Sequence, residues 1–419
     1  MPMPVRSLPT VQNWDCHTCG DCCRTYVVRV TTEERDRILK QGWMADPALN
    51  GAEPIRYDKR LGEYALSHTA DGTCVFLGPD NLCRIHAKFG EAAKPFACRL
   101  YPFALVPHGD HWTVAVRYAC PSVTDNLGRP CTAHAADVSA VAKLVEADQP
   151  QSANLPAATL QPGQTVPWAD ADRFTKTFVK LVTNPAHPLE RRLRQAAALA
   201  AVCRQARFDT VSGGRLNEFL QVVSAATADE VPADPYSVPR PGWVGRTLFR
   251  QLLGIYVRHD HGPHAGAGQR GRWARFAAGW KFALGAGSVP RLHAELPAGV
   301  RFAAAEQPLG ELPPEADELL TRYLRVKLES GQFYGPTNHH RGYWDGLASL
   351  LLVHPTVMWV TRVLVAGGRD KLAAVKWGLR MADDNFGYSK FLGGPRAGWI
   401  LRTLDTRGEV PRLIASYGR

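Results

Sequence analysis

Cysteines near the N-terminus carry the clearest chemistry in this sequence. Four of them occur in one short run, Cys16-His17-Thr18-Cys19-Gly20-Asp21-Cys22-Cys23. Thiolates ligate zinc and iron, and such spacing lets one turn of backbone present several sulfurs to one centre. The CxxCxxC part has the spacing of a bacterial ferredoxin loop, in which Gly20 would relieve crowding. The run therefore predicts a metal centre, with an iron-sulfur cluster favoured over zinc.

Further cysteines follow in separate blocks. Cys74, Cys83 and Cys98 form a second group, and Cys120 stands directly before Pro121. A 4Fe-4S cluster or a zinc site takes four ligands, so the candidates suffice for two centres, and spacing does not tell which of them share one. Some could instead pack as small apolar side chains. The candidate metal ligands are Cys16, Cys19, Cys22, Cys23, Cys74, Cys83, Cys98 and Cys120.

Two more cysteines and two histidines are weaker candidates. Cys131 and Cys203 are expected to be ordinary residues without a metal. His86 follows Cys83 by three positions and could be a ligand, but a lone histidine is more often a hydrogen-bonded core residue. The same two interpretations apply to His17.

The positions of the cysteines and of the charged residues limit which kinds of protein this chain could be. Nine of the ten cysteines precede Thr132, and without a visible export signal such clustering favours metal ligation over disulfides. Residues 1–14 contain no apolar stretch of signal-peptide length, so a cytoplasmic location is expected. The formal net charge is +11, and it belongs almost entirely to the chain beyond residue 135.

The basic C-terminal part could attract an acidic protein, nucleic acid or a membrane surface, or could simply present solvated helix faces. No run of Lys and Arg is interleaved with aromatic residues, so no clear nucleic-acid signature is seen. The most apolar stretch, residues 347–366, contains His354, Pro355 and Arg362, which a spanning helix would have to bury in lipid. This stretch predicts a buried helix pair or hairpin and no transmembrane segment.

The predicted fold class is α+β, with a small cysteine-rich mixed module followed by a mainly α-helical region. Residues 1–135 form the module. Within it, residues 25–30 are rich in β-formers, Thr31 and Glu34 offer a capping box for a helix through Leu39, and alternating apolar residues at 112–118 predict a half-buried strand.

Residues 136–167 are rich in Ala, Pro, Gln and Ser and predict a short helix followed by a linker. From residue 168 to 419 the apolar periodicity becomes helical. Helices are expected around 174–182 and over 189–207, 245–257, 272–284, 316–330 and 372–384.

The cysteine motifs resemble a known family. The blocks CxxCGxCCR at residues 16–24, CVFL at 74–77, CRIH at 83–86 and CRLYPF at 98–103 look like the zinc- or iron-chelating CxxCxxCC cluster family. Within that family they are most similar to the flagellin lysine N-methylases, and the segments 323–333 and 375–391 resemble the closing helices of those enzymes. The long helical extension also favours this branch, because short family members stop after the cysteine module.

The resemblance implies S-adenosylmethionine as methyl donor and a protein lysine, in a substrate such as flagellin, as acceptor. It also implies a cluster held by the matching residues Cys16, Cys19, Cys22, Cys23, Cys74, Cys83 and Cys98. One departure is Ser122, which stands where the family pattern has Gly.

The catalytic residues are not identified by the sequence. Lysine methylation needs a general base or a desolvated channel, and no residue is assigned to that role. Residues 266–271 match GxGxxG, but they follow a loop rich in His, Gly and Pro instead of a strand, so they predict a flexible loop. The favoured hypothesis is a cluster-dependent protein-lysine N-methyltransferase. The alternative is a non-catalytic zinc-binding, iron-sulfur or electron-transfer module with a helical partner-binding region.

Overall fold

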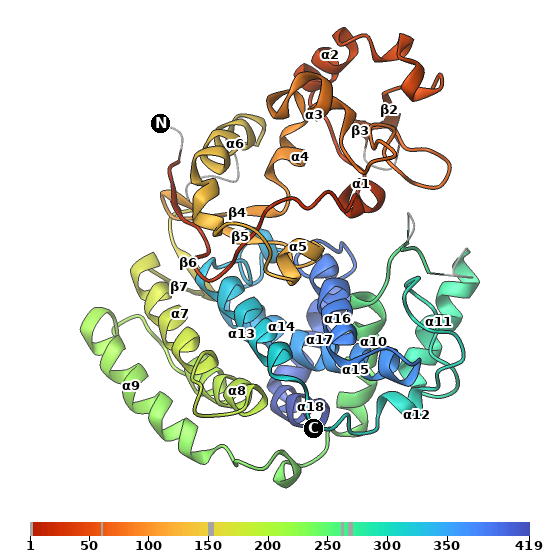
Figure 1. The fold of residues 1–419 in the computed structure, drawn as a ribbon. Coiled ribbons are helices and arrows are strands. Elements are labelled where there is room, and N and C mark those ends of the chain that lie inside the picture. Colours follow the sequence, from red (N-terminus) through yellow and green to blue (C-terminus); the bar gives the residue numbers. More distant parts are fainter. Residues whose placement is uncertain (1–2, 60–61, 150–154, 261–263, 267–270) are drawn as a thin grey trace.

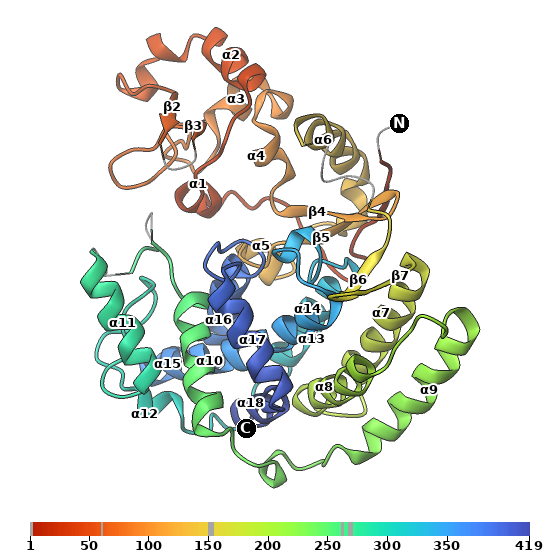
Figure 2. The same ribbon diagram turned by 180° about the vertical axis from the view of Figure 1, so that it is seen from behind.

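The chain folds into a mixed α+β structure with most of its helices in the C-terminal two thirds (Figure 1). The computed structural model describes residues 3–59, 62–149, 155–260, 264–266 and 271–419. A smaller lobe, drawn in red and orange, stands beside a larger helical body, and the view from behind in Figure 2 shows the same division. The α+β prediction with a mainly helical C-terminal part is confirmed.

The smaller lobe consists of short helices and one hairpin. Its elements are α1 (Asp21–Thr25), α2 (Thr32–Lys40), β2 (Ile55–Asp58), β3 (Glu63–Leu66), α3 (Arg84–Phe89) and α4 (Phe96–Leu100). The capping box of α2 is confirmed: Glu34 N–H donates to the Thr31 hydroxyl at 3.2 Å, and Thr31 N–H donates to the Glu34 carboxylate at 3.1 Å.

The predicted strand at residues 25–30 is wrong at its start, because Thr25 is the last residue of α1. The remainder is extended and borders β3, where Val30 N–H donates to Tyr64 O and Leu66 N–H donates to Val28 O, each at 2.9 Å. The extended segment therefore begins only after the helical turn that contains Cys22 and Cys23.

A three-stranded sheet lies between the lobe and the helical body. It contains β1 (Val5–Ser7), β4 (Phe103–His108) and β5 (His111–Val116) in the order β1-β5-β4, with β1 parallel and β4 antiparallel to β5. The half-buried prediction for the strand at 112–118 is wrong, because every residue from Trp112 to Val116 is buried. As the central strand, β5 is also covered by the helical body, where the Thr113 hydroxyl donates to Ser330 O at 2.6 Å.

The predicted helices of the C-terminal part are confirmed within a few residues at each end. Helix α5 (Pro121–Thr124) lies on the side of the sheet that faces the body, whereas α6 (Ala135–Asp148) packs against α4 and β1. The body contains α7 (Trp168–Val182), α8 (Leu189–Gln205), α9 (Gly213–Glu230), α10 (Trp243–Tyr256), α11 (Arg272–Leu284), α12 (Phe302–Ala305), α13 (Pro314–Glu329), α14 (Tyr343–Leu351), α15 (Val353–Ala366), α16 (Lys371–Asn385), α17 (Pro395–Thr406) and α18 (Glu409–Tyr417).

The apolar stretch at 347–366 is a buried helix pair, as expected. Among the described residues, Tyr343–Ala366 is the one helical stretch long and apolar enough to cross a membrane, and 94% of its most apolar window is buried inside the protein. Pro355 lacks an N–H for the carbonyl of Leu351, so α14 ends there and α15 restarts with the proline in its first turn.

The segment predicted as a linker holds ordered structure. After α6, β6 (Ala158–Gln161) and β7 (Gln164–Val166) form a hairpin that packs against α14 and buries Ala158, Leu160 and Val166. Residues 150–154 lie outside the described residues. The proposed limits at residues 135 and 167 stay a prediction.

Two hydrophobic cores underlie this arrangement. The smaller core belongs to the lobe and includes Ile38, Trp43, Phe76 and Ile85. The larger core runs from Phe103 in the sheet through the helical body. The sheet therefore packs as part of the body, and the lobe carries its own core beside the cysteines.

Candidate metal centre

Helix α1 places two cysteine side chains side by side. The Sγ atoms of Cys22 and Cys23 lie 4.0 Å apart. Two thiolates on one tetrahedral zinc, each about 2.3 Å from the metal, would be separated by about 3.8 Å. Gly20 allows the tight entry into α1, since its φ is +70° and a Cβ there would lie 2.5 Å from Nη1 of Arg24.

Three cysteines from later segments reach the same part of the lobe. Cys74 N–H donates to Cys23 O at 2.8 Å, which ties the second block to the first. Cys83 directly precedes α3 and forms an isolated bridge with Leu77, three residues after Cys74. Cys98 lies in α4 and packs, with Cys23 and Cys83, against the small core that contains Cys74. The structure thus gathers Cys22, Cys23, Cys74, Cys83 and Cys98.

The thiols of this group influence one another electrostatically. Burial raises the pKa of Cys74 to about 12, with the nearby thiolates of Cys83 and Cys22 adding to the effect. A hydrogen bond with Cys23, together with burial, raises the pKa of Cys22 well above its ordinary range. Burial raises the pKa of Cys98 as well, and Cys74 contributes further. Thiols so close together cannot ionise together unless a cation compensates them.

The other three predicted ligands lie toward the helical body. Cys16 and Cys19 are exposed, and Cys120 is buried at the start of α5. Burial raises the pKa of Cys120 to about 11, and the thiolates of Cys19 and Cys22 add to this shift. Burial also raises the pKa of Cys19; a hydrogen bond with the Asp21 backbone opposes this shift, and the charges of Asp21, Cys22 and Cys16 add to it. Cys22, a member of the group of five, is therefore near enough to influence Cys19 and Cys120 as well.

The donor set fits a soft or borderline metal. All ten cysteines are free thiols, and eight of them form these two neighbouring groups. In the described part of the chain, no three His, Cys, Asp or Glu side chains already stand in a metal-binding arrangement. Metal binding requires the thiols to lose their protons. We therefore expect the thiolates to move into their final metal-binding arrangement only when the metal binds. Sulfur-rich sites select zinc or iron-sulfur clusters.

The weaker candidates differ in their surroundings. Cys131 and Cys203 are completely buried in the larger core, where burial raises the pKa of each to about 12. His86 is exposed on α3, and His17 contacts Asp15 O at 2.8 Å through its Nδ1. Residues 267–270 of the GxGxxG match lie outside the described residues.

Asp21, inside the cysteine run, joins the lobe to the helical body. Its carboxylate accepts from Arg380 of α16 at 2.6 Å and contacts Nε2 of His264 at 2.8 Å. Arg380 also donates through Nε to Ala119 O, next to Cys120. Burial opposes ionisation of Asp21, but the contacts with His264 and Arg380 outweigh it and lower its pKa. Sequence reasoning missed this residue, whose only signal was its place between Cys19 and Cys22.

Three histidines gather next to this contact. The rings of His264 and His293 stack with centroids 5.4 Å apart, and the His259 ring lies 5.8 Å from that of His293. Burial, together with the nearby His259 and His264, lowers the pKa of His293 to about 3, so this ring stays neutral. Its Nδ1 accepts Glu295 N–H at 3.1 Å, which leaves the proton on Nε2.

Asp384 of α16 orients His259 within this group. Its carboxylate lies 3.2 Å from His259 Nδ1, 2.9 Å from Arg117 and 2.7 Å from the Tyr26 hydroxyl. Despite burial, these partners, with His259 first, lower the pKa of Asp384 to about 2. An ionised Asp384 accepts a hydrogen bond from His259 Nδ1–H, which leaves His259 Nε2 as the acceptor. The sequence offered no periodic or motif signal for this pair.

One comparison with known proteins concerns the cysteine-rich region. Residues 15–133 match the CxxCxxCC family model, which is described as a putative zinc- or iron-chelating domain. No curated protein and no solved structure matches the chain. The match supports the resemblance of the N-terminal region to this family, and with it the chelation of zinc or iron. It does not include the helical body.

Proposed function

We propose that the cysteine groups hold an iron-sulfur cluster and that the protein is a cluster-dependent lysine N-methyltransferase. The observation that carries the metal assignment is the convergence of Cys22, Cys23, Cys74, Cys83 and Cys98 from four separate segments. The family match supports zinc or iron, and the bacterial ferredoxin spacing of CxxCxxC favours the cluster.

The contact between Asp21 and the helical body supports a reaction site beside the metal. Methyl transfer to lysine requires removal of a proton from the ammonium group, after which the amine lone pair attacks the methyl carbon. The carbon–sulfur bond of the S-adenosylmethionine sulfonium would break as the new carbon–nitrogen bond forms, and the neutral thioether would leave. His259 is the base in this proposal, because Asp384 fixes its tautomer with Nε2 free to accept the proton.

The substrate in this proposal is a lysine of a protein such as flagellin. The ten free cysteines support a reducing compartment, so the proposal places the protein in the cytoplasm. The basic surface of the helical part would help to dock an acidic protein substrate.

Spectroscopy of anaerobic protein tests the metal assignment. An iron-sulfur cluster gives a brown preparation, broad visible absorbance that bleaches in air, and an electron paramagnetic resonance signal in the reduced state or after oxidation. A colourless preparation with stoichiometric zinc would contradict the cluster and leave the thiol-rich site as a zinc centre.

Label transfer tests the methyltransferase assignment. Anaerobic protein is incubated with methyl-labelled S-adenosylmethionine and either purified flagellin or a host-cell extract. His259→Asn should retain the metal and lose most of the transfer, while His187→Ala, outside the histidine group, should retain both. If the wild type labels no protein while its cluster is intact, the methyltransferase proposal fails.

The second candidate is a non-catalytic metal-binding or electron-transfer protein with a helical region that binds a partner. The large exposed aromatic side chains on α11 favour it. An intact centre with no methyl transfer, together with a stable complex through the helical body, would support this candidate over the enzyme.

A further inference from the structure

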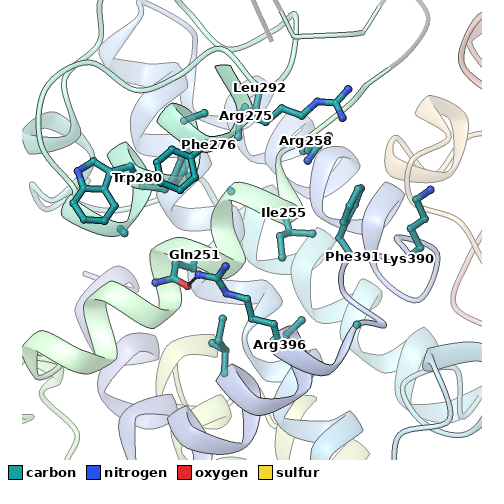
Figure 3. A pocket seen from close by; sticks show the side chains of 18 of the residues that line it. Gln251, Ile255, Arg258, Arg275, Phe276, Trp280, Leu292, Lys390, Phe391 and Arg396 are labelled. Carbon is teal, nitrogen blue, oxygen red and sulfur yellow. Dashed lines mark hydrogen bonds between the residues drawn. The ribbon is translucent and has the colours of Figure 1, made fainter. Parts of the chain in front are cut away.

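A groove opens in the helical body, away from the cysteine groups. Its volume is about 640 Å³. Figure 3 shows Ile255 and Gln251 of α10 on its floor, Phe276 and Trp280 of α11 on one wall, and Phe391 on the opposite wall. The start of α17 completes that second wall. The groove is thus an apolar channel framed by helices.

The aromatic wall continues outward along α11. Trp273 is 84% exposed, Phe276 66%, and Trp280 and Leu284 59% each. These residues follow one another at spacings of three and four, so they share one face of the helix. Exposed clusters of large apolar residues mark interaction surfaces, and Trp and Phe supply much of the binding energy at protein interfaces. Trp273, Phe276, Trp280 and Leu284 thus form an exposed apolar stripe on α11, of which Trp273 and Leu284 lie outside the groove.

The rim of the groove is cationic. The lining residues include Arg258, Arg275, Lys390 and Arg396 and no carboxylate. In the described ranges of the chain, no ion pair joins Arg275, Lys390 or Arg396 to an acidic side chain. Arg258 binds Asp260 through Nε at 2.6 Å, but its Nη2 is buried and has no hydrogen-bond partner. Arg396 donates to the Gln251 side-chain oxygen at 2.8 Å, which is a neutral acceptor. Three cations at the rim therefore have no carboxylate partner, and a ligand could supply one.

We propose that this groove docks an amphipathic, acidic α-helix of a partner protein. Apolar side chains at i, i+3, i+4 and i+7 of that helix would fill the channel between Trp280 and Phe391, as in other helix-in-groove complexes. Glu and Asp on its flanks would pair with Arg275 and Lys390 on opposite sides. Charge complementarity of this kind raises the association rate and excludes basic partners.

Two other occupants fit the geometry less well. A lipid bilayer is flat and would leave the concave floor at Ile255 unfilled. A small amphiphilic anion would fill the channel but leave Trp273 and Leu284 exposed. A helix covers both the channel and the stripe, since α11 with its 13 residues is about 20 Å long.

A designed peptide tests the proposal. The probe is a fluorescein-labelled helix of about 18 residues with Leu at i, i+3, i+4 and i+7 and Glu on its flanks. We expect saturable binding to the full-length protein by anisotropy, weakened by salt. The same peptide with Lys in place of Glu should bind at least about tenfold more weakly.

Variants of the groove complete the test. Gly279→Phe adds a ring at a residue that lines the channel, where a Cβ meets no atom within 4 Å, and it should abolish binding. The double variant Arg275→Glu and Arg396→Glu should reduce binding at least about tenfold. Arg215→Glu on α9, which is exposed and outside the groove, is the matched control and should leave binding unchanged.

Three results would overturn the proposal. They are equal binding of the Glu and Lys peptides, unchanged binding by Gly279→Phe, and binding to phosphatidylserine vesicles without binding to the Glu peptide. The last result would identify the surface as a membrane contact. The proposal does not depend on the metal centre, so its outcome is separate from that of the methyltransferase assay.

Discussion

Replacing Asp383 by alanine should leave the buried ammonium group of Lys327 without its counter-ion, where α16 meets the three-stranded sheet. Lys327 Nζ lies 2.6 Å from Asp383 Oδ1, and both side chains have no exposed surface. Asp383 also accepts Ala119 N–H at 3.1 Å, directly before Cys120. Removing one partner of such a buried pair costs about 3–5 kcal/mol, a large part of a total stability of about 5–15 kcal/mol.

The pH dependence of this variant has a defined sign. Burial lowers the pKa of Lys327, and the nearby Asp383 opposes that shift. Without Asp383 the pKa falls further, so the unfolded state binds a proton that the folded state gives up. The free energy of unfolding of the variant should therefore rise with pH up to the ordinary lysine pKa of about 10.4. Urea denaturation, followed by tryptophan fluorescence at several pH values, measures this.

Two comparisons separate the buried pair from a general surface effect. Glu329→Ala removes the solvent-accessible pair of Arg325 and Glu329, which lies at 2.7 Å, and should cost about 0.5 kcal/mol or less. The double variant Lys327→Met and Asp383→Leu should recover most of the lost stability, because it leaves no uncompensated charge. If Asp383→Ala costs no more than Glu329→Ala, the reasoning about this pair is refuted.

Three further predictions concern the lobe and the core. Gly20→Ala should weaken metal retention, since a Cβ there lies 2.5 Å from Arg24 Nη1 at a φ of +70°; retention equal to wild type in metal analysis would contradict this. Thr31→Ala should cost about 1 kcal/mol in urea denaturation by removing the α2 capping box, and an unchanged midpoint would count against it. Burial lowers the pKa of His354 to about 4, so wild-type stability should fall as pH drops from about 6.5 to 4, because the unfolded state takes up the proton first. In His354→Leu, the loss of unfolding free energy between pH 6.5 and 4 should be smaller by up to about 3 kcal/mol. If the stability of the variant and of the wild type falls in parallel with pH, the lowered pKa of His354 is disproved.

The sequence predicted local features well. The capping box of α2 and the limits of α11 depend on residues a few positions apart, so their patterns are visible in the chain itself. The break between α14 and α15 follows equally from one proline.

Features that depend on distant contacts could not be predicted. The strand at 112–118 alternates apolar and small or polar residues, yet both faces are buried, because Ser330 and α13 cover the side that alternation suggested was exposed. The contact between Asp21 and His264 joins residues 243 positions apart, and no periodicity links them. The cysteines were found because their residue type and spacing are themselves the chemical signal.

The most direct test of the account is the metal content of anaerobically purified cysteine variants. Cys74→Ala and Cys98→Ala each remove a thiol from the group of five, whereas Cys203→Ala removes a buried thiol from the larger core. Iron, zinc and sulfide analysis should show the metal lost from the first two variants and retained at the wild-type ratio in the third. Full metal retention in both Cys74→Ala and Cys98→Ala, or equal loss in Cys203→Ala, would contradict the proposed centre.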